Sequence, residues 1–140
     1  RLAEAARNAG VITADEFAVF QNAGYMGLYG GMTVDDIHRK KNLEVGQKIL
    51  DYMGSTELIA NLFRISQTEE KLRKDSVNSA DTATAVHYKG GSEVREAIEK
   101  IGGTMPEDLP TPEKSIAQLE KEQLQRLKQQ ALDGQLMLDE

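Results

Sequence analysis

Residues 54–75 read GSTELIANLFRISQTEEKLRKD, and this stretch predicts the central helix of the protein. Its apolar residues recur mostly at intervals of three and four, as on the buried face of a helix. They are Leu58, Ile59, Leu62, Phe63, Ile65 and Leu72. Ser55 is placed to cap the first turn, and Glu57 lies where the helix dipole favours an anion. The stretch therefore predicts a helix with an apolar buried face and a charged outer face.

Shorter helices are predicted before this stretch. Residues 2–9 have a helical pattern of Leu and Ala, and Gly10 is a natural stop. Thr13 followed by Glu16 is a capping-box pattern, which opens a helix expected to end near residues 22–24. The inward face of that helix is expected to carry Phe17, Ala18 and Phe20, with Val19 as a further candidate. The glycines of residues 25–31, Gly27 among them, predict tight turns pinned to the core by aromatic side chains.

Two further helices are predicted between residues 33 and 53. Thr33 is placed to cap the first, whose inward residues are expected to be Val34 and Ile37. Residues 43–53 predict another short helix, weakened by Gly46.

A long helix is predicted from about residue 79 to residue 101, with Asn78 or Ser79 as its cap. Its apolar stripe is Ala83, His87, Gly90, Val94, Ala97 or Ile98, and Ile101. The stripe runs through Gly90 and Gly91, which cost roughly 1 kcal/mol each in a helix interior. They are tolerated where another backbone packs closely. The alternative is a break at residues 89–91, with Ser92 capping a separate helix.

The three prolines all lie between residues 105 and 113, and residues 105–112 predict an extended linker. Ser115 with Gln118 is a second capping-box pattern, and it opens a helix expected to reach about Leu132, with Gly134 as its stop. That helix has a thin apolar stripe, made of Ile116, Leu119, Leu124, Leu127 and Ala131. Such a helix is either an exposed tail or docks on another chain.

The whole pattern predicts an all-α fold: a compact multi-helix bundle with a central helix, a Pro-containing linker and a C-terminal amphipathic helix. Residues 1–104 would form the helical core, residues 105–112 the linker, and residues 113–140 the C-terminal helix and tail. No extended alternation of period two predicts a sheet.

The amino-acid composition limits the kinds of protein that this chain can be. The 140 residues are 39% apolar and only 5% aromatic, which predicts a modest core. A net charge of -6 disfavours non-specific nucleic-acid binding by bulk electrostatics. Cysteine is absent and no apolar run is long enough to span a bilayer, which fits a cytoplasmic protein. Arg1 already lies in a helical pattern, so we expect a fragment of a longer protein.

The sequence predicts no catalytic, metal or cofactor site. His38 shares a helix face with Asp35, but two ligands are too few for a closed zinc site. His87 lies on an apolar stripe and is expected to be partly buried with its hydrogen bonds satisfied. No nucleophile is paired with a base at a recognisable spacing, so we expect that the protein is not an enzyme.

Several segments closely resemble the C-terminal half of the bacterial DNA-damage-inducible protein D family. They are residues 48–72, 15–22, 27–31, 36–38 and 102–112, in family order between about Leu2 and Glu120. The resemblance implies a member of the SOS response to DNA damage, whose full-length proteins also have an N-terminal BRO-type domain. It further implies modulation of the RecA filament, with strand exchange restrained. It supplies no catalytic or metal-binding residues.

Two hypotheses follow. In the first, the chain is a helical interaction module that acts on RecA–ssDNA filaments or self-associates through its C-terminal helix. Its candidate contacts lie on the expected outer face of the central helix: Arg64, Gln67, Glu70, Lys71 and Lys74. In the second, it binds DNA directly as an antirepressor-like or transcriptional module. The candidate phosphate contacts are then two basic patches, Arg39-Lys40-Lys41 and residues 71–74.

Overall fold

A computed structural model describes the backbone of residues 1–139 and the side chains of residues 1–134. In this part of the chain all regular structure is helical, which confirms the all-α prediction. The helices are α1 (Leu2–Asn8), α2 (Ala14–Leu28), α3 (Val34–Lys40), α4 (Ser55–Lys74), α5 (Ala80–Ile101) and α6 (Ile116–Asp139), with two short 3-10 turns, η1 (Ile49–Asp51) and η2 (Pro106–Asp108). None of the described helices is both long and apolar enough to cross a bilayer.

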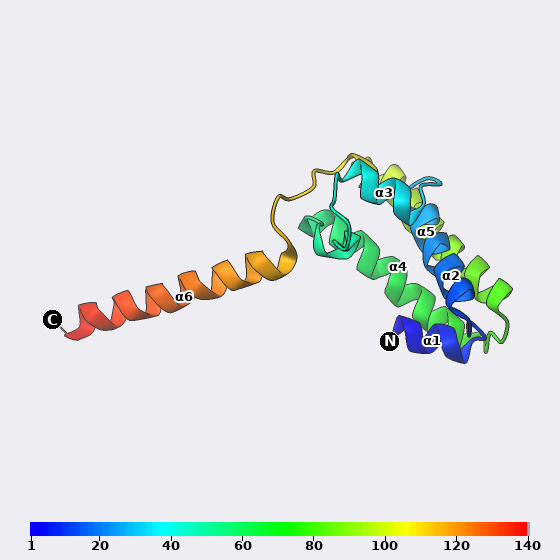
Figure 1. Cartoon of the computed structure of the whole chain (residues 1–140), viewed down its shortest axis with the longest axis horizontal. Helices are drawn as coiled ribbons and strands as arrows, with labels where there is room; N and C mark the ends of the chain where they lie inside the picture. The colour runs from blue at the N-terminus through cyan, green and yellow to red at the C-terminus, as the bar shows by residue number, and fades with distance from the viewer. Residues whose placement is uncertain (140) are drawn as a thin grey trace.

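The body of the bundle is built from α2, α4 and α5, and α5 packs against both of the others. Figure 1 shows α1 near the C-terminal end of α4 and α3 at the opposite end of the body. One apolar cluster, which includes Phe20 and Leu72, lies at the α1 end. A second, which includes Leu28 and Ile37, lies at the α3 end. The buried polar side chains of α4 belong to neither cluster.

The predicted helix starts are largely confirmed. Thr13 and Glu16 form a capping box at α2, and Thr33 and Asp36 form another at α3. Ser79 caps α5 by accepting from the backbone N–H of Thr82. The α5 helix runs without a break through both of its glycines, as the preferred prediction had it.

The end of α2 differs from the prediction. The helix does not stop at residues 22–24 but continues to Leu28, so Gly27 is helical and forms no turn. A Cβ atom on Gly27 would lie 2.2 Å from the carbonyl oxygen of Tyr88, and one on Gly91 would lie 2.5 Å from that of Gly24. These glycines let the α2 and α5 backbones touch, and this packing offsets the propensity cost of glycine in a helix.

Three other boundary predictions are wrong. Residues 43–53 form turns and the short η1 rather than a helix, and Gly46 has a φ of +88°, which no right-handed helix accommodates. Gly54, not Ser55, is the N-cap of α4, and no side chain caps that end. The α6 helix continues through Gly134 to Asp139.

The orientation of the central helix is the main correction. Ile59, Leu62 and Phe63 were expected to face the core, but they are 66%, 51% and 53% exposed. The core side of α4 instead carries polar residues together with Leu72: Glu57, Asn61, Arg64 and Thr68 are all buried. Smaller errors of the same kind occur elsewhere, since Ala18, Val19 and Ile101 are exposed as well. Polar side chains can occupy a core when partners from other helices satisfy them.

Residues 105–112, here called the strap, lie against the bundle. Pro106 is buried, and both Nη atoms of Arg95 on α5 donate to the carboxylate of Glu107, at 2.8 and 2.9 Å. Beyond the strap, α6 extends away from the body of the bundle (Figure 1). The division into core, linker and tail remains a prediction.

A buried polar network and two exposed surfaces of the central helix

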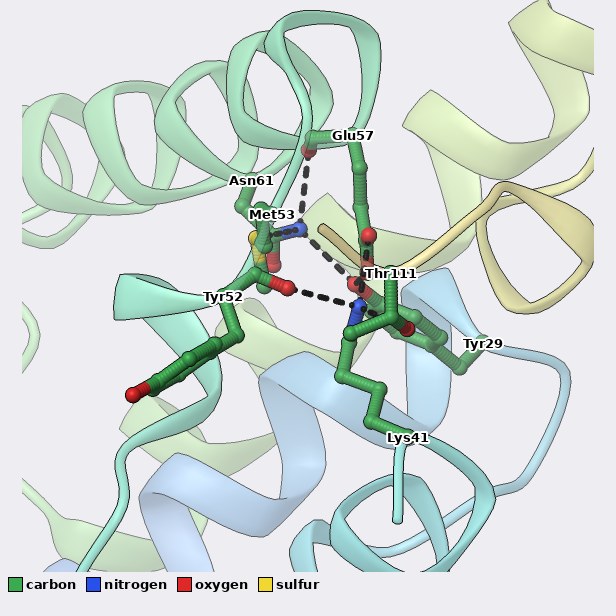
Figure 2. Close-up of polar contacts among 7 residues, drawn as sticks. All are labelled: Tyr29, Lys41, Tyr52, Met53, Glu57, Asn61 and Thr111. Carbon is green, nitrogen blue, oxygen red and sulfur yellow. Dashed lines mark hydrogen bonds and ion pairs between the residues drawn. The ribbon is translucent and has the colours of Figure 1, made fainter. Parts of the chain in front are cut away.

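The polar network begins with a buried ion pair between Lys41, just after α3, and Glu57 in the first turn of α4. The Lys41 Nζ lies 2.7 Å from Glu57 Oε1, and the two side chains are 6% and 0% exposed. Figure 2 shows the same Nζ directed toward the carbonyl oxygen of Tyr52 (3.1 Å) and the hydroxyl of Thr111 (3.5 Å). This lysine therefore ties α4 to the strap.

Tyr29 and Asn61 continue the network. The Tyr29 hydroxyl donates to Glu57 Oε2 at 2.5 Å, and Asn61 Nδ2 donates to the Tyr29 oxygen at 3.0 Å (Figure 2). Burial and then the neighbouring carboxylate raise the pKa of Tyr29, so the phenol stays protonated and remains a donor. Asn61 Oδ1 in turn accepts from Arg64 Nε at 3.1 Å.

Arg64 and His87 complete the network on the α5 side. His87 Nδ1 lies 2.8 Å from the carbonyl oxygen of Phe20, which can only accept, so Nδ1 carries the hydrogen. Nε2 then has a free lone pair and accepts from Arg64 Nη1 at 2.9 Å. Burial and the Arg64 charge lower the pKa of His87 to about 4, which keeps the ring neutral. The Arg64 guanidinium also lies over the ring of Tyr25, 4.3 Å from its centroid.

This arrangement is structural in character. Its charged groups are buried: Lys41 pairs with Glu57, and Arg64 bonds to neutral acceptors. Its hydrogen bonds join α2, α4 and α5 with the segment after α3. Within the residues that the structure describes, no group of three or more His, Cys, Asp or Glu is placed to hold a metal ion. The other histidine, His38, is half-buried, and its Nε2 lies 2.9 Å from the carbonyl oxygen of Gln47.

The assignment of two residues, Arg64 and Lys41, as surface contacts is wrong. Arg64 is 2% exposed and cannot reach a partner from the interior of the bundle. The Lys41 side chain is 6% exposed, and its ammonium group is paired with Glu57. A long charged side chain is rarely fully buried unless it is paired. The partners that hold these cations to other segments are distant in the sequence: Glu57 is 16 residues from Lys41, and His87 is 23 residues from Arg64.

The remaining predicted contacts are exposed but do not form one surface. Gln67, Glu70, Lys71 and Lys74 lie on α4, whereas Arg39 and Lys40 lie on α3 at the opposite end of the body. Most of the cations are already paired with acids. Arg39 pairs with Asp36, Lys40 with Asp108, Lys71 with Asp75 and Arg73 with Glu69, at 2.7 to 3.4 Å. The two basic patches are thus separate and largely neutralised.

Sequence analysis missed the apolar residues of two exposed surfaces of α4. The first, here called the outer face, consists of residues spaced by three and four along the helix: Ile59, Leu62, Ser66, Glu70 and Lys74. The second is the α4–α5 groove, a cavity of about 410 Å³ whose apolar lining includes Phe63, Val86 and Val94. The paired apolar residues at 58–59 and 62–63 were the available signal, because two such pairs span more of a helix than one face can bury.

Comparison with known proteins identifies the family of the chain. A family model described as the DinD C-terminal domain matches residues 1–119. DNA damage-inducible protein D of Escherichia coli (strain K12) is 60% identical over 120 residues, which are 86% of this chain and 44% of that protein. The chain therefore spans less than half the length of this relative. No solved structure matches the chain.

Proposed function

The chain belongs to the DinD C-terminal domain family, and from this we propose that it is a non-catalytic interaction module of a DNA-damage-inducible protein, acting on RecA–ssDNA filaments to restrain strand exchange. The name of its relative supports a role in the response to DNA damage. The choice of RecA follows from the family resemblance of the sequence.

The observation that carries the proposal is the outer face of α4. Ile59 and Leu62 are more than half exposed there, and Glu70 and Lys74 follow on the same face. An apolar patch bordered by charged side chains is typical of a protein-binding surface. Mixed charge suits a protein partner better than a phosphate backbone, which selects for cations alone.

The buried network supports this function indirectly. It holds α4 through hydrogen bonds to the helices on both sides, and the most buried residues of α4 belong to it or pack beside it. A rigid helix loses little conformational entropy when its exposed face binds a partner. The polar interior therefore helps to present the outer face in a fixed geometry.

Retention of the chain on RecA filaments assembled on ssDNA tests the proposal. We expect the unmodified chain to be retained, and the double variants Ile59→Ser/Leu62→Ser and Glu70→Lys/Lys74→Glu to be lost. Val19→Ser is a matched control, because Val19 is an exposed aliphatic residue on α2. Equal retention of all the variants would remove the outer face from the proposal. No retention of the unmodified chain would show that this part of the protein does not bind RecA.

Direct DNA binding remains the alternative, and less supports it. Lys41 is buried and the other cations of α3 are paired with acids. Titration against ssDNA and dsDNA at two salt concentrations separates the two functions. Phosphate contacts would give an affinity that falls steeply as the salt concentration rises, and we expect no such binding.

A further inference from the structure

The α4–α5 groove has the features of an unfilled binding site for a helix. Phe63 on α4 is 53% exposed at its edge, and Val86 and Val94 on α5 contribute to its lining. A Cβ atom on Gly90 would lie 2.7 Å from Thr68 Oγ1, so the glycine lets Thr68 of α4 lie close to the α5 backbone in the groove. Lys71, Lys89 and Glu93 also line the groove.

Thr68 is a polar residue of the groove whose hydroxyl lacks a hydrogen-bond partner in the part of the chain that the structure describes. Its side chain also lines the groove and is 1% exposed, and its Oγ1 is the single buried side-chain nitrogen or oxygen without a hydrogen-bond partner among the described residues. Buried polar atoms are nearly always satisfied, and an exception calls for an explanation. A partner that brings both apolar side chains and a polar group into the groove would supply the missing hydrogen bond.

The α6 helix of the same chain has that chemistry. Its leucines are 42–55% exposed and cover nothing in their own chain: Leu119, Leu124, Leu127 and Leu132. Glu120 and Gln123 lie among them on the same side of the helix, spaced by four from Leu124 and Leu127 respectively. Helix packing in proteins is normally secured by burial of such an apolar stripe.

The strap directs α6 away from its own groove. Arg95 holds Glu107 through two hydrogen bonds, Lys41 contacts Thr111, and Pro106 is buried. With the strap fixed in this way, α6 projects outward (Figure 1). We propose that α6 of one copy lies in the α4–α5 groove of a second copy, and that the exchange is reciprocal, so the domain is a two-fold symmetric dimer.

The dimensions and charges fit this exchange. A 24-residue helix is about 36 Å long and α4, with 20 residues, about 30 Å. The lining residues run from Phe63 to Lys71 on α4 and from Val86 to Val94 on α5, about 13 Å along each helix, so α6 is long enough to cross the whole groove. The carboxylate of Glu120 would meet the ammonium group of Lys89 in the groove, and the Gln123 amide would approach Thr68.

Light scattering during gel filtration tests the dimer. We expect the mass of two chains for the unmodified protein and of one chain for Leu124→Asp/Leu127→Asp. Phe63→Ser, in the groove, should also give one chain while circular dichroism shows an unchanged helix content. Gln125→Asp is the matched control on α6, because Gln125 is turned away from Leu127. The mass of one chain for the unmodified protein at its highest soluble concentration would overturn the proposal.

Cross-linking separates exchange between copies from folding back within one chain. The sequence has no cysteine, so a disulfide can form only between introduced cysteines. A mixture of a Phe63→Cys chain and a Leu127→Cys chain should form a disulfide-linked dimer on oxidation. A monomer with an internal disulfide, formed only when both cysteines are in the same chain, would overturn the proposal in favour of folding back. None of these variants changes the outer face, so the result is independent of RecA binding.

Discussion

Arg64 Nη1 on α4 lies 2.9 Å from Nε2 of the neutral His87 on α5, in the middle of the bundle. The cation has no carboxylate among its hydrogen-bond partners, which are His87 and Asn61, with the ring of Tyr25 beneath it. The carboxylate of this network belongs to Glu57, and it is paired with Lys41. The bundle thus places a charged group at its centre and satisfies it with neutral acceptors from two helices.

Removal of the Arg64 side chain should strongly destabilise the fold. Arg64→Ala leaves a cavity and deprives Asn61 and His87 of their partner, and we expect a loss of about 4 kcal/mol in the free energy of unfolding. Urea unfolding followed by circular dichroism measures it. Gln67→Ala on the exposed side of α4 should change stability by less than about 0.5 kcal/mol. Similar small effects for both variants would contradict the central role of Arg64.

Acid should destabilise the protein through His87. The folded-state pKa of His87 is lowered to about 4, below its ordinary value of 6.5, so the unfolded chain binds the proton more tightly. The stability contributed by the neutral ring is fully present above pH 6.5 and is lost as the pH falls toward 4, with a slope of at most about 1.4 kcal/mol per pH unit. His87→Gln cannot titrate, so its unfolding free energy should vary less over this window. Parallel pH profiles for the two proteins would disprove the assignment.

The Lys41–Glu57 pair should show strong coupling. Either Lys41→Met or Glu57→Gln alone leaves a buried charge without its partner, and each should cost about 3–5 kcal/mol. The double variant removes both charges and should cost less than the sum of the two. Thermal and urea unfolding of all four proteins completes the cycle, with Lys40→Met as the exposed control. Additive effects would show that the pair is not coupled in the folded protein.

Gly27→Ala should destabilise the contact between α2 and α5, although alanine is the better helix former. The new Cβ would lie 2.2 Å from the carbonyl oxygen of Tyr88, and a backbone atom can only move with its helix. We expect a loss of about 2 kcal/mol or more, beyond the gain of about 1 kcal/mol in propensity. Gly134→Ala in α6 has open space around it and should instead raise the helix content. A more stable Gly27→Ala protein would contradict the close approach.

Loss of the Arg95–Glu107 contact should loosen the strap. The hydrogen bond from Arg95 is the largest influence that lowers the pKa of Glu107, so the carboxylate is charged at neutral pH. Glu107→Gln should speed hydrogen exchange at the backbone N–H groups of Asp108 and Leu109 by about tenfold, as expected for a loss of about 1.4 kcal/mol. Glu113→Gln, beyond the strap, is the control. Unchanged exchange rates would show that the Arg95–Glu107 contact does not hold the strap.

Local chemistry explains why much of the fold was predictable. Thr13 and Thr33 start their helices with side chains that bond to their own first turns, and Ser79 does the same for α5. The continuous stripe from Ala83 to Val94 predicted one helix through two glycines. Each of these features depends on residues within a few positions of one another, so the sequence alone contains the cause.

The candidate surfaces were much less predictable. Four of the five residues proposed on α4 are exposed, but Arg64 is not, and the exposure of Ile59, Leu62 and Phe63 was missed. The apolar pattern showed that α4 has distinct faces. It could not show which face is buried, because that depends on partners far away in the chain.

The sequence by itself determined that the chain is helical, where most of its helices begin, and which family it resembles. Only the tertiary structure decided which way α4 faces. Burying Glu57, Asn61 and Arg64 is tolerable because Lys41, Tyr29 and His87 approach from other segments and satisfy them. A polar group costs free energy when it is buried without a partner and little when it has one. That difference is a property of the assembled bundle, and it leaves the aliphatic side of α4 exposed.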